Sequence, residues 1–251
     1  MMKSGWTLRC HSTEPNREMR RFVALNHQSH RRWHYRPNND FSFAREVSQI
    51  ELIITEIWQI ASRFPTVFLG SSPESMTPIA IIGRPGQSNG LVTREGTWNL
   101  STLPSLLKIY PFALERPEDG RMRVLIDESS ACFDGLADTP LFNDDGTPSP
   151  ALQRLMALFQ SVHAGLREAQ TLGRVASELA LLSMPNQHDA FSEEPYYVVD
   201  MEKLNALSDA QLIVLRKRNW LPVLYAMALS VQFDLDSNYP VFWTRVRDER
   251  P

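Results

Sequence analysis

The chain has 251 residues, of which 43% are hydrophobic and 22% are charged. This length and composition allow a substantial buried core, and we expect one α+β domain rather than two small ones. The 26 Lys and Arg residues nearly balance the 29 Asp and Glu residues, giving a formal net charge of -3. That balance excludes a global positive field for attracting nucleic acid or an anionic membrane surface.

The two ends of the chain differ in character from its middle. Residues 1–20 are polar and show no sustained hydrophobic period, so we expect a flexible basic tail there. A single domain then covers residues 21–235, and a second tail covers residues 236–251. The first 45 residues contain nine Lys or Arg against three acids. A solvated arm explains this excess, and an acidic partner is the alternative.

The number of cysteines and the hydropathy of the chain indicate in which cellular compartment the protein is expected. Only Cys10 and Cys132 are present, so we expect neither a disulfide framework nor a thiolate metal site, as is usual in a reducing cytoplasm. Residues 1–21 lack the apolar core of a secretory signal. The longest apolar run, Leu221–Val231, is shorter than the ~20 residues that cross a bilayer. These features predict a cytoplasmic protein without a membrane span.

The stretch from Trp98 to Asp134 concentrates apolar residues and turn signals. It predicts strands at Tyr110–Glu115 and Met122–Ile126, joined by a hairpin loop at Arg116–Gly120. Further strands are predicted at Phe64–Leu69 and Thr77–Gly83, and a small hairpin at 91–98. We therefore expect a largely antiparallel sheet that meanders from Thr66 to Asp127, with a helical interruption near Leu103–Lys108, and with helices of the C-terminal part packed on it.

Helices are predicted from apolar periodicity and capping residues. Ser48–Ala61 places its isoleucines at helical intervals, and Ser149-Pro150 is a favourable helix start. Gly173 or Arg174 marks a bend, after which the helix is expected to resume over Val175–Leu182. The C-terminal part predicts a strand at 196–199, a helical turn capped by Asp200, a helix opened by Ser208, a left-handed Asn219, and a last helix over 220–232.

The hairpin delivers polar side chains to one edge of the core. Asp127 and Glu128 are adjacent carboxylates that could divide acid and base roles if their environments differ, with His30 as a third candidate catalytic group. Candidate ligand-binding residues beside the hairpin are Trp98, Tyr110, Ser129, Arg45 and Glu56. Because Glu56 borders an apolar stripe, we predict that it either pairs with a cation such as Arg45 or turns to the surface.

Two groups of residues resemble metal ligands by type, although their spacing is unfavourable. His27, His30 and His34 approach helical spacing, but the Pro37 that follows argues against a long regular helix. The loop after the hairpin carries four acids, Asp134, Asp138, Asp144 and Asp145, which depart from the calcium-loop rule. We expect no metal site and no cofactor.

Several runs of the chain together resemble the SapC-like family of bacterial proteins, which is named after a component of a surface-layer locus. The matching runs are FVALNHQSH, DFSFAREV, the segment from Leu52 to Phe68, GRPGQSNGLVTREGTWNL, KIYPFAL, RVLIDESS, LFNDDGTPSPALQ and YYVVDMEKLNALSDAQL. Of the early histidines, only His30 occupies a family motif position. The peptide-transport permease that shares the SapC name is a different, multi-spanning protein.

The resemblance implies no agreed catalytic activity, and it leaves three hypotheses. The first is a non-catalytic accessory or regulatory protein that binds a protein or small molecule beside the hairpin. The family resembles proteins encoded near TonB-dependent receptors and tryptophan-halogenase-like proteins, which implies a link to nutrient uptake. The second is an enzyme with a site near Asp127 and Glu128, and the third is a surface-layer structural component. Self-association is left open.

Overall fold

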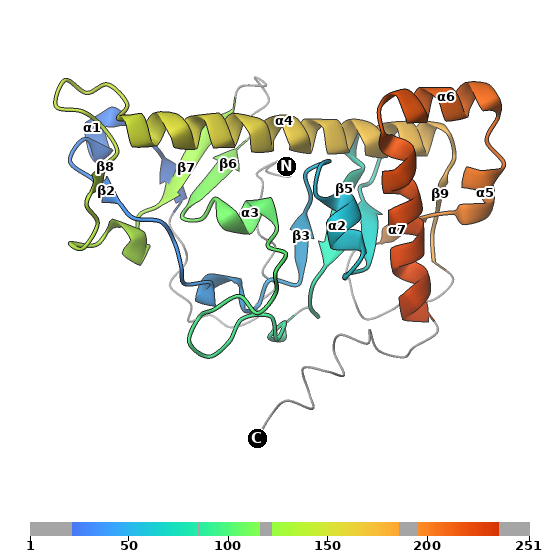
Figure 1. The fold of residues 1–251 in the computed structure, drawn as a ribbon, viewed down its shortest axis with the longest axis horizontal. Coiled ribbons are helices and arrows are strands. Elements are labelled where there is room, and N and C mark those ends of the chain that lie inside the picture. Colours follow the sequence, from blue (N-terminus) through green and yellow to red (C-terminus); the bar gives the residue numbers. More distant parts are fainter. Residues whose placement is uncertain (1–21, 85, 116–121, 186–194, 236–251) are drawn as a thin grey trace.

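The computed structural model describes residues 22–84, 86–115, 122–185 and 195–235 (Figure 1). Its strands are β1 (Phe22–Ala24), β2 (His34–Tyr35), β3 (Gln49–Glu51), β4 (Thr66–Leu69), β5 (Thr77–Ile81), β6 (Phe112–Glu115), β7 (Arg123–Asp127), β8 (Thr139–Pro140), β9 (Leu182–Ser183) and β10 (Tyr196–Val199). Its helices are α1 (His27–His30), α2 (Ile57–Ala61), α3 (Ser105–Lys108), α4 (Pro150–Glu178), α5 (Met201–Asn205), α6 (Asp209–Lys217) and α7 (Trp220–Leu235). The expected tails at 1–20 and 236–251 and the hairpin loop at 116–120 lie outside the described residues.

The fold is α+β, as predicted, but the strands form two main antiparallel sheets instead of one. The larger sheet has the order β3-β5-β4-β10-β9, and the smaller has the order β1-β7-β6. The predicted hairpin of β6 and β7 is confirmed, with Leu114 opposite Val124. The prediction of one meandering sheet was wrong, because β5 and β6 do not pair. Instead, β10 pairs with β4 in the larger sheet and β1 pairs with β7 in the smaller one, and these partners are distant in the chain and leave no local sequence signal.

The long helix α4 packs on both sheets. Its N-terminal and central turns place Leu152, Phe159 and Leu166 in the core of the smaller sheet. Its C-terminal half places Leu172 and Ala176 in the core of the larger sheet. With 29 residues, the helix has a length of about 43 Å at the standard rise per residue. Figure 1 shows α4 running across the top of the molecule, over the strands of both sheets.

Two glycines allow other segments to approach α4 closely. A Cβ added at Gly165 would lie 2.8 Å from Ile53 Cβ, and the backbone N–H of Ile54 donates to Gly165 O at 3.1 Å. A Cβ at Gly173 would overlap the carbonyl group of Met76. The predicted bend at Gly173 was therefore wrong, because this glycine provides space for a neighbouring backbone within an uninterrupted helix. The helix also does not resume toward residue 182, since Leu182 begins β9.

The predicted helix at 48–61 was wrong over its first half. Residues 49–51 form β3, with Ile50 opposite Ala80 of β5, and only Ile57–Ala61 is helical. Ile50 and Leu52 are two residues apart and both buried, which is the period of a strand. Hydrogen bonds to β5 thus override the local helical spacing of the isoleucines.

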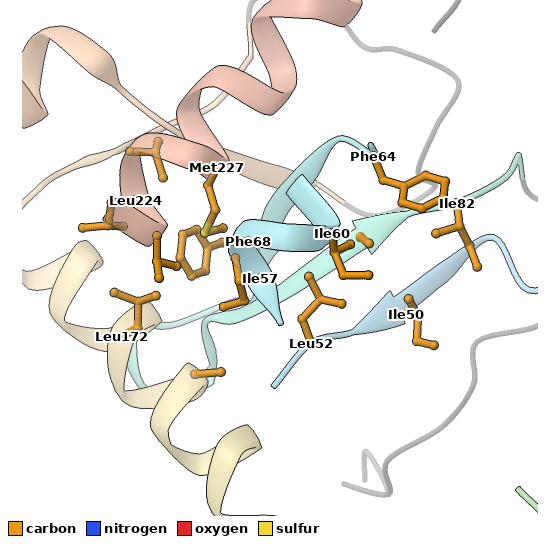
Figure 2. Close-up of a cluster of buried hydrophobic side chains, with 14 of the residues drawn as sticks. Ile50, Leu52, Ile57, Ile60, Phe64, Phe68, Ile82, Leu172, Leu224 and Met227 are labelled. Carbon is orange, nitrogen blue, oxygen red and sulfur yellow. The ribbon is translucent and has the colours of Figure 1, made fainter. Parts of the chain in front are cut away.

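The C-terminal helices agree with their capping signals. Asp200 accepts hydrogen bonds from two backbone N–H groups at the start of α5, Ser208 and Gln211 form a capping box, and Asn219 has a φ of 55°. Figure 2 shows Leu224 and Met227 of α7 near Ile57 and Phe68 in the core of the larger sheet. No helix among the described residues is long and apolar enough to cross a membrane.

Substitution of Gly173 by Ala should destabilise the protein by about 1–3 kcal/mol, because the new methyl group would collide with backbone atoms of Met76. Helix propensity alone predicts the opposite sign, a gain of about 1 kcal/mol. Urea unfolding measures the difference. The matched control is Gly135→Ala, since a Cβ at Gly135 has no atom within 4 Å; equal effects of the two substitutions would contradict the close packing of α4.

Candidate functional site

Five of the eight predicted site residues meet at the C-terminal end of β7. Asp127 is fully buried, and its Oδ2 accepts a hydrogen bond of 2.9 Å from the Tyr110 hydroxyl. Its Oδ1 accepts hydrogen bonds from the Ser129 backbone N–H at 3.1 Å and from the Ser129 Oγ at 2.6 Å. Both carboxylate oxygens are thus used internally, where they fix the turn after β7 and the position of the Tyr110 ring.

Glu128, the residue after Asp127, contacts the buried His30. The His30 side chain is 0% exposed and that of Glu128 is 30% exposed, and His30 Nε2 lies 3.3 Å from Glu128 Oε1. The Asn26 backbone N–H can only donate, and it lies 3.1 Å from His30 Nδ1. The Asn26 carbonyl oxygen lies 3.0 Å from the same Nδ1, so the backbone of Asn26 holds one edge of the ring while Nε2 faces Glu128. Trp33 packs edge-on against the imidazole, with ring centroids 5.0 Å apart.

A row of aromatic rings joins Tyr110 to Trp98. Phe43 stacks on Tyr110 with centroids 3.9 Å apart and an interplanar angle of 16°. Phe41 lies 6.0 Å from Phe43 and 6.4 Å from Trp98, again between ring centroids. The Trp98 indole donates to Thr102 O at 2.9 Å and is itself buried. Phe41, Phe43 and Tyr110 are only partly buried, so this aromatic row reaches the surface.

The sequence prediction missed Phe41 and Phe43. They lie in the run DFSFAREV, around a 3₁₀ turn at 42–44. Their spacing of two residues resembles a strand or a loop, and nothing local indicates that they bridge to Tyr110. The recurrence of two phenylalanines in a polar segment was the available signal.

Arg45 holds the turn at residues 93–97, which directly precedes Trp98. The Arg45 guanidinium donates to the carbonyl oxygens of Thr93 and Arg94, at 2.6 and 2.8 Å. Phe41 N also donates to Gly96 O at 2.7 Å. These bonds fasten the 93–97 turn onto the segment that carries the phenylalanines. Arg45 therefore supports the aromatic row through the backbone, and its guanidinium does not pair with Glu56.

Glu56 is 8% exposed and is therefore not turned to the surface, and the cation whose charge acts on it is Lys108 and not the predicted Arg45. Its side chain accepts from the Ser105 N–H at 2.9 Å, from the Ser105 hydroxyl at 2.7 Å and from the Ile53 N–H at 3.1 Å. These bonds cap the first turn of α3 from outside the helix. Burial raises the pKa of the Glu56 carboxyl, and the hydrogen bonds and the charge of Lys108 oppose that shift.

The other groups considered as metal ligands have separate structural roles. His27 packs edge-on against Phe142, and His34 Nδ1 contacts the Arg32 carbonyl oxygen. Asp134 pairs with Arg36 at 2.9 Å, and Asp145 accepts hydrogen bonds from Thr147 within its turn. Within the described part of the chain, no group of three or more His, Cys, Asp or Glu side chains could hold a metal ion.

The raised pKa of Glu56 predicts a specific pH dependence. A carboxyl whose pKa is higher in the folded state contributes stability below its unfolded pKa of about 4.3, and this contribution is lost as the pH rises through the folded pKa. The difference in unfolding free energy between wild type and Glu56→Gln should therefore decrease from acidic to neutral pH. Urea titrations at a series of pH values measure it.

Asp200→Asn is the matched control of opposite sign. Hydrogen bonds from the Lys203 N–H and the Ser183 hydroxyl lower the pKa of Asp200, so its contribution is present above the unfolded pKa and lost as the pH falls through the folded pKa. Asparagine keeps the capping ability. If both substitutions changed the pH profile in the same direction, the account of Glu56 would be wrong.

The comparisons with known proteins agree with the resemblance carried by the sequence runs. No curated protein and no solved structure matches the chain. The family model SapC matches residues 25–233, a range that contains the hairpin, the aromatic row and the His30–Glu128 pair. The match covers most of the chain, and the protein therefore belongs to the SapC family.

Proposed function

We propose that this protein is an accessory or regulatory binding protein of the bacterial cytoplasm, which holds a protein or small-molecule partner beside the β6–β7 hairpin. The observation that carries the proposal is the placement of Glu128. This carboxylate reaches the surface and is held from below by the fully buried His30. A charged acceptor that is already oriented loses little conformational freedom when a partner binds.

The surroundings of Glu128 support recognition of an amphipathic group. Phe41, Phe43 and Tyr110 form a partly exposed aromatic surface, and Tyr110 is tied to Asp127, the residue before Glu128. Half-buried aromatic rings are common in binding hot spots, and these rings are linked to Glu128 through the neighbouring Asp127. Such a surface fits a partner group that combines an amino or guanidinium donor with an apolar body.

The family resemblance supplies the candidate partners. A tryptophan-halogenase-like protein and a TonB-dependent receptor encoded by the same genome are the proteins to test, and the halogenase-like protein comes first because the receptor lies in the outer membrane. This choice rests on the genomic neighbourhood that the resemblance implies for the family. The proposal accordingly places the protein in nutrient uptake or its control, and cell fractionation tests its cytoplasmic location.

Glu128→Gln should weaken binding of the purified full-length chain to such a partner by ~10-fold or more, because it removes the negative charge. The amide oxygen of the glutamine can still contact His30, so the position of the side chain is retained. Calorimetric titration measures the dissociation constant. Glu115→Gln is the matched control, since Glu115 lies on the same hairpin and pairs with Arg123 at 3.8 Å in an exposed position. Equal affinity of wild type and Glu128→Gln, or no binding to any candidate, contradicts the proposal.

A second candidate function is an enzyme, and the contact between His30 and Glu128 favours it. An imidazole that orients a partly exposed carboxylate is an arrangement used for general acid or base catalysis. Because both oxygens of Asp127 are engaged internally, Glu128 would act on the substrate and His30 would position it. A metabolite extract incubated with the protein should then show a change by mass spectrometry that Glu128→Gln abolishes and Glu115→Gln retains. No change with wild type counts against the enzyme.

A further inference from the structure

Helix α6 is held rigidly at one end of the molecule. The capping box of Ser208 and Gln211 closes its N-terminus. Its inner face consists of the fully buried Leu215, flanked by the half-buried Gln211 and Leu212, and it packs on α7. In Figure 1, α6 lies at the corner beyond the upper end of α7.

The outer face of α6 is apolar in its middle and charged at both ends. Ile213 is 51% exposed and Val214 is 52% exposed. Asp209, Ile213 and Lys217 follow at intervals of four residues, so they form one row along the side of the helix away from Leu215, and the exposed Arg216 adds a second cation beside Lys217. Asp209 and Lys217 are exposed, and the described residues include no ion-pair partner for either.

This row is complementary to itself. Ile213 lies midway between Asp209 and Lys217, so a two-fold rotation through Ile213 places each end of the row opposite the other end of a second copy. We propose that α6 is the contact surface through which two copies of this chain associate as an isologous dimer. Ile213 and Val214 pack across the axis, and Asp209 faces Lys217 of the partner subunit.

The size of the face sets the strength of the dimer. A single helix of nine residues offers an interface at the low end of the range, below about 1,200 Å² in total. The dimer is therefore weak and depends on protein concentration. The apolar centre supplies the attraction, and the two ion pairs fix the antiparallel direction of the helices, since a parallel arrangement would oppose like charges.

Sedimentation equilibrium of the full chain over a concentration series tests the dimer. Asp209→Lys and Lys217→Asp should each raise the dimer dissociation constant by ~10-fold or more, because like charges then face each other. The double variant Asp209→Lys/Lys217→Asp restores opposite charges and should return the constant to within ~3-fold of wild type. Glu202→Lys, on the neighbouring helix α5, is the control and should leave the constant unchanged.

The double variant separates the interface from any effect on folding, since a loss of helix structure would not be rescued by a second charge reversal. Circular dichroism of each variant confirms that the helices are retained. Ile213→Asp should abolish self-association. Wild type that is monomeric at all concentrations up to millimolar, a double variant that behaves like the single ones, or a dimer that survives Ile213→Asp overturns the proposal.

Discussion

The shared helix α4 is the constraint on which the rest of the structure depends. Each of the two sheets buries its apolar face partly against one half of this helix, and the two halves belong to the same continuous hydrogen-bonded rod. A bend near the middle would separate the two cores. The close approaches of Ile53 at Gly165 and of Met76 at Gly173 are possible only because neither glycine carries a side chain. The absence of a side chain at Gly165 and Gly173 therefore sets how closely the neighbouring segments pack against α4.

Glu56 provides a second connection between the same two parts. It lies just before α2, whose residues Ile57 and Ile60 belong to the core of the larger sheet, and it accepts hydrogen bonds from Ser105 at the start of α3. The chain continues from α3 directly into β6 of the smaller sheet. Burial of a carboxylate is unfavourable unless its hydrogen bonds are satisfied, and here three donors satisfy it. The polar interaction therefore determines where the hairpin begins relative to the larger core.

Local signals in the sequence predicted many helices and strands, whereas the pairing of strands that are distant in the chain could not be predicted from the sequence. The Ser208 capping box, the left-handed Asn219 and the β6–β7 hairpin depend on neighbouring residues and were confirmed. The division into two sheets depends on pairs such as Tyr196 with Leu69, which are more than one hundred residues apart. For the same reason, the segment at 49–51 was predicted as helix, although its pairing with β5 makes it a strand.

The candidate site shows the same limit at the scale of side chains. Asp127, Glu128 and Ser129 are consecutive, and Tyr110 lies just before β6, the strand that pairs with β7, so their meeting could be predicted. The contact of Phe43 with Tyr110 could not be predicted, because no local pattern indicates the stacking of the two rings. His30 is the informative case. It lies 98 positions from Glu128, and no local pattern indicates that this buried imidazole contacts the partly exposed carboxylate. Of the two neighbouring carboxylates, Asp127 is fully buried and uses both oxygens internally, whereas Glu128 stays 30% exposed above a buried partner.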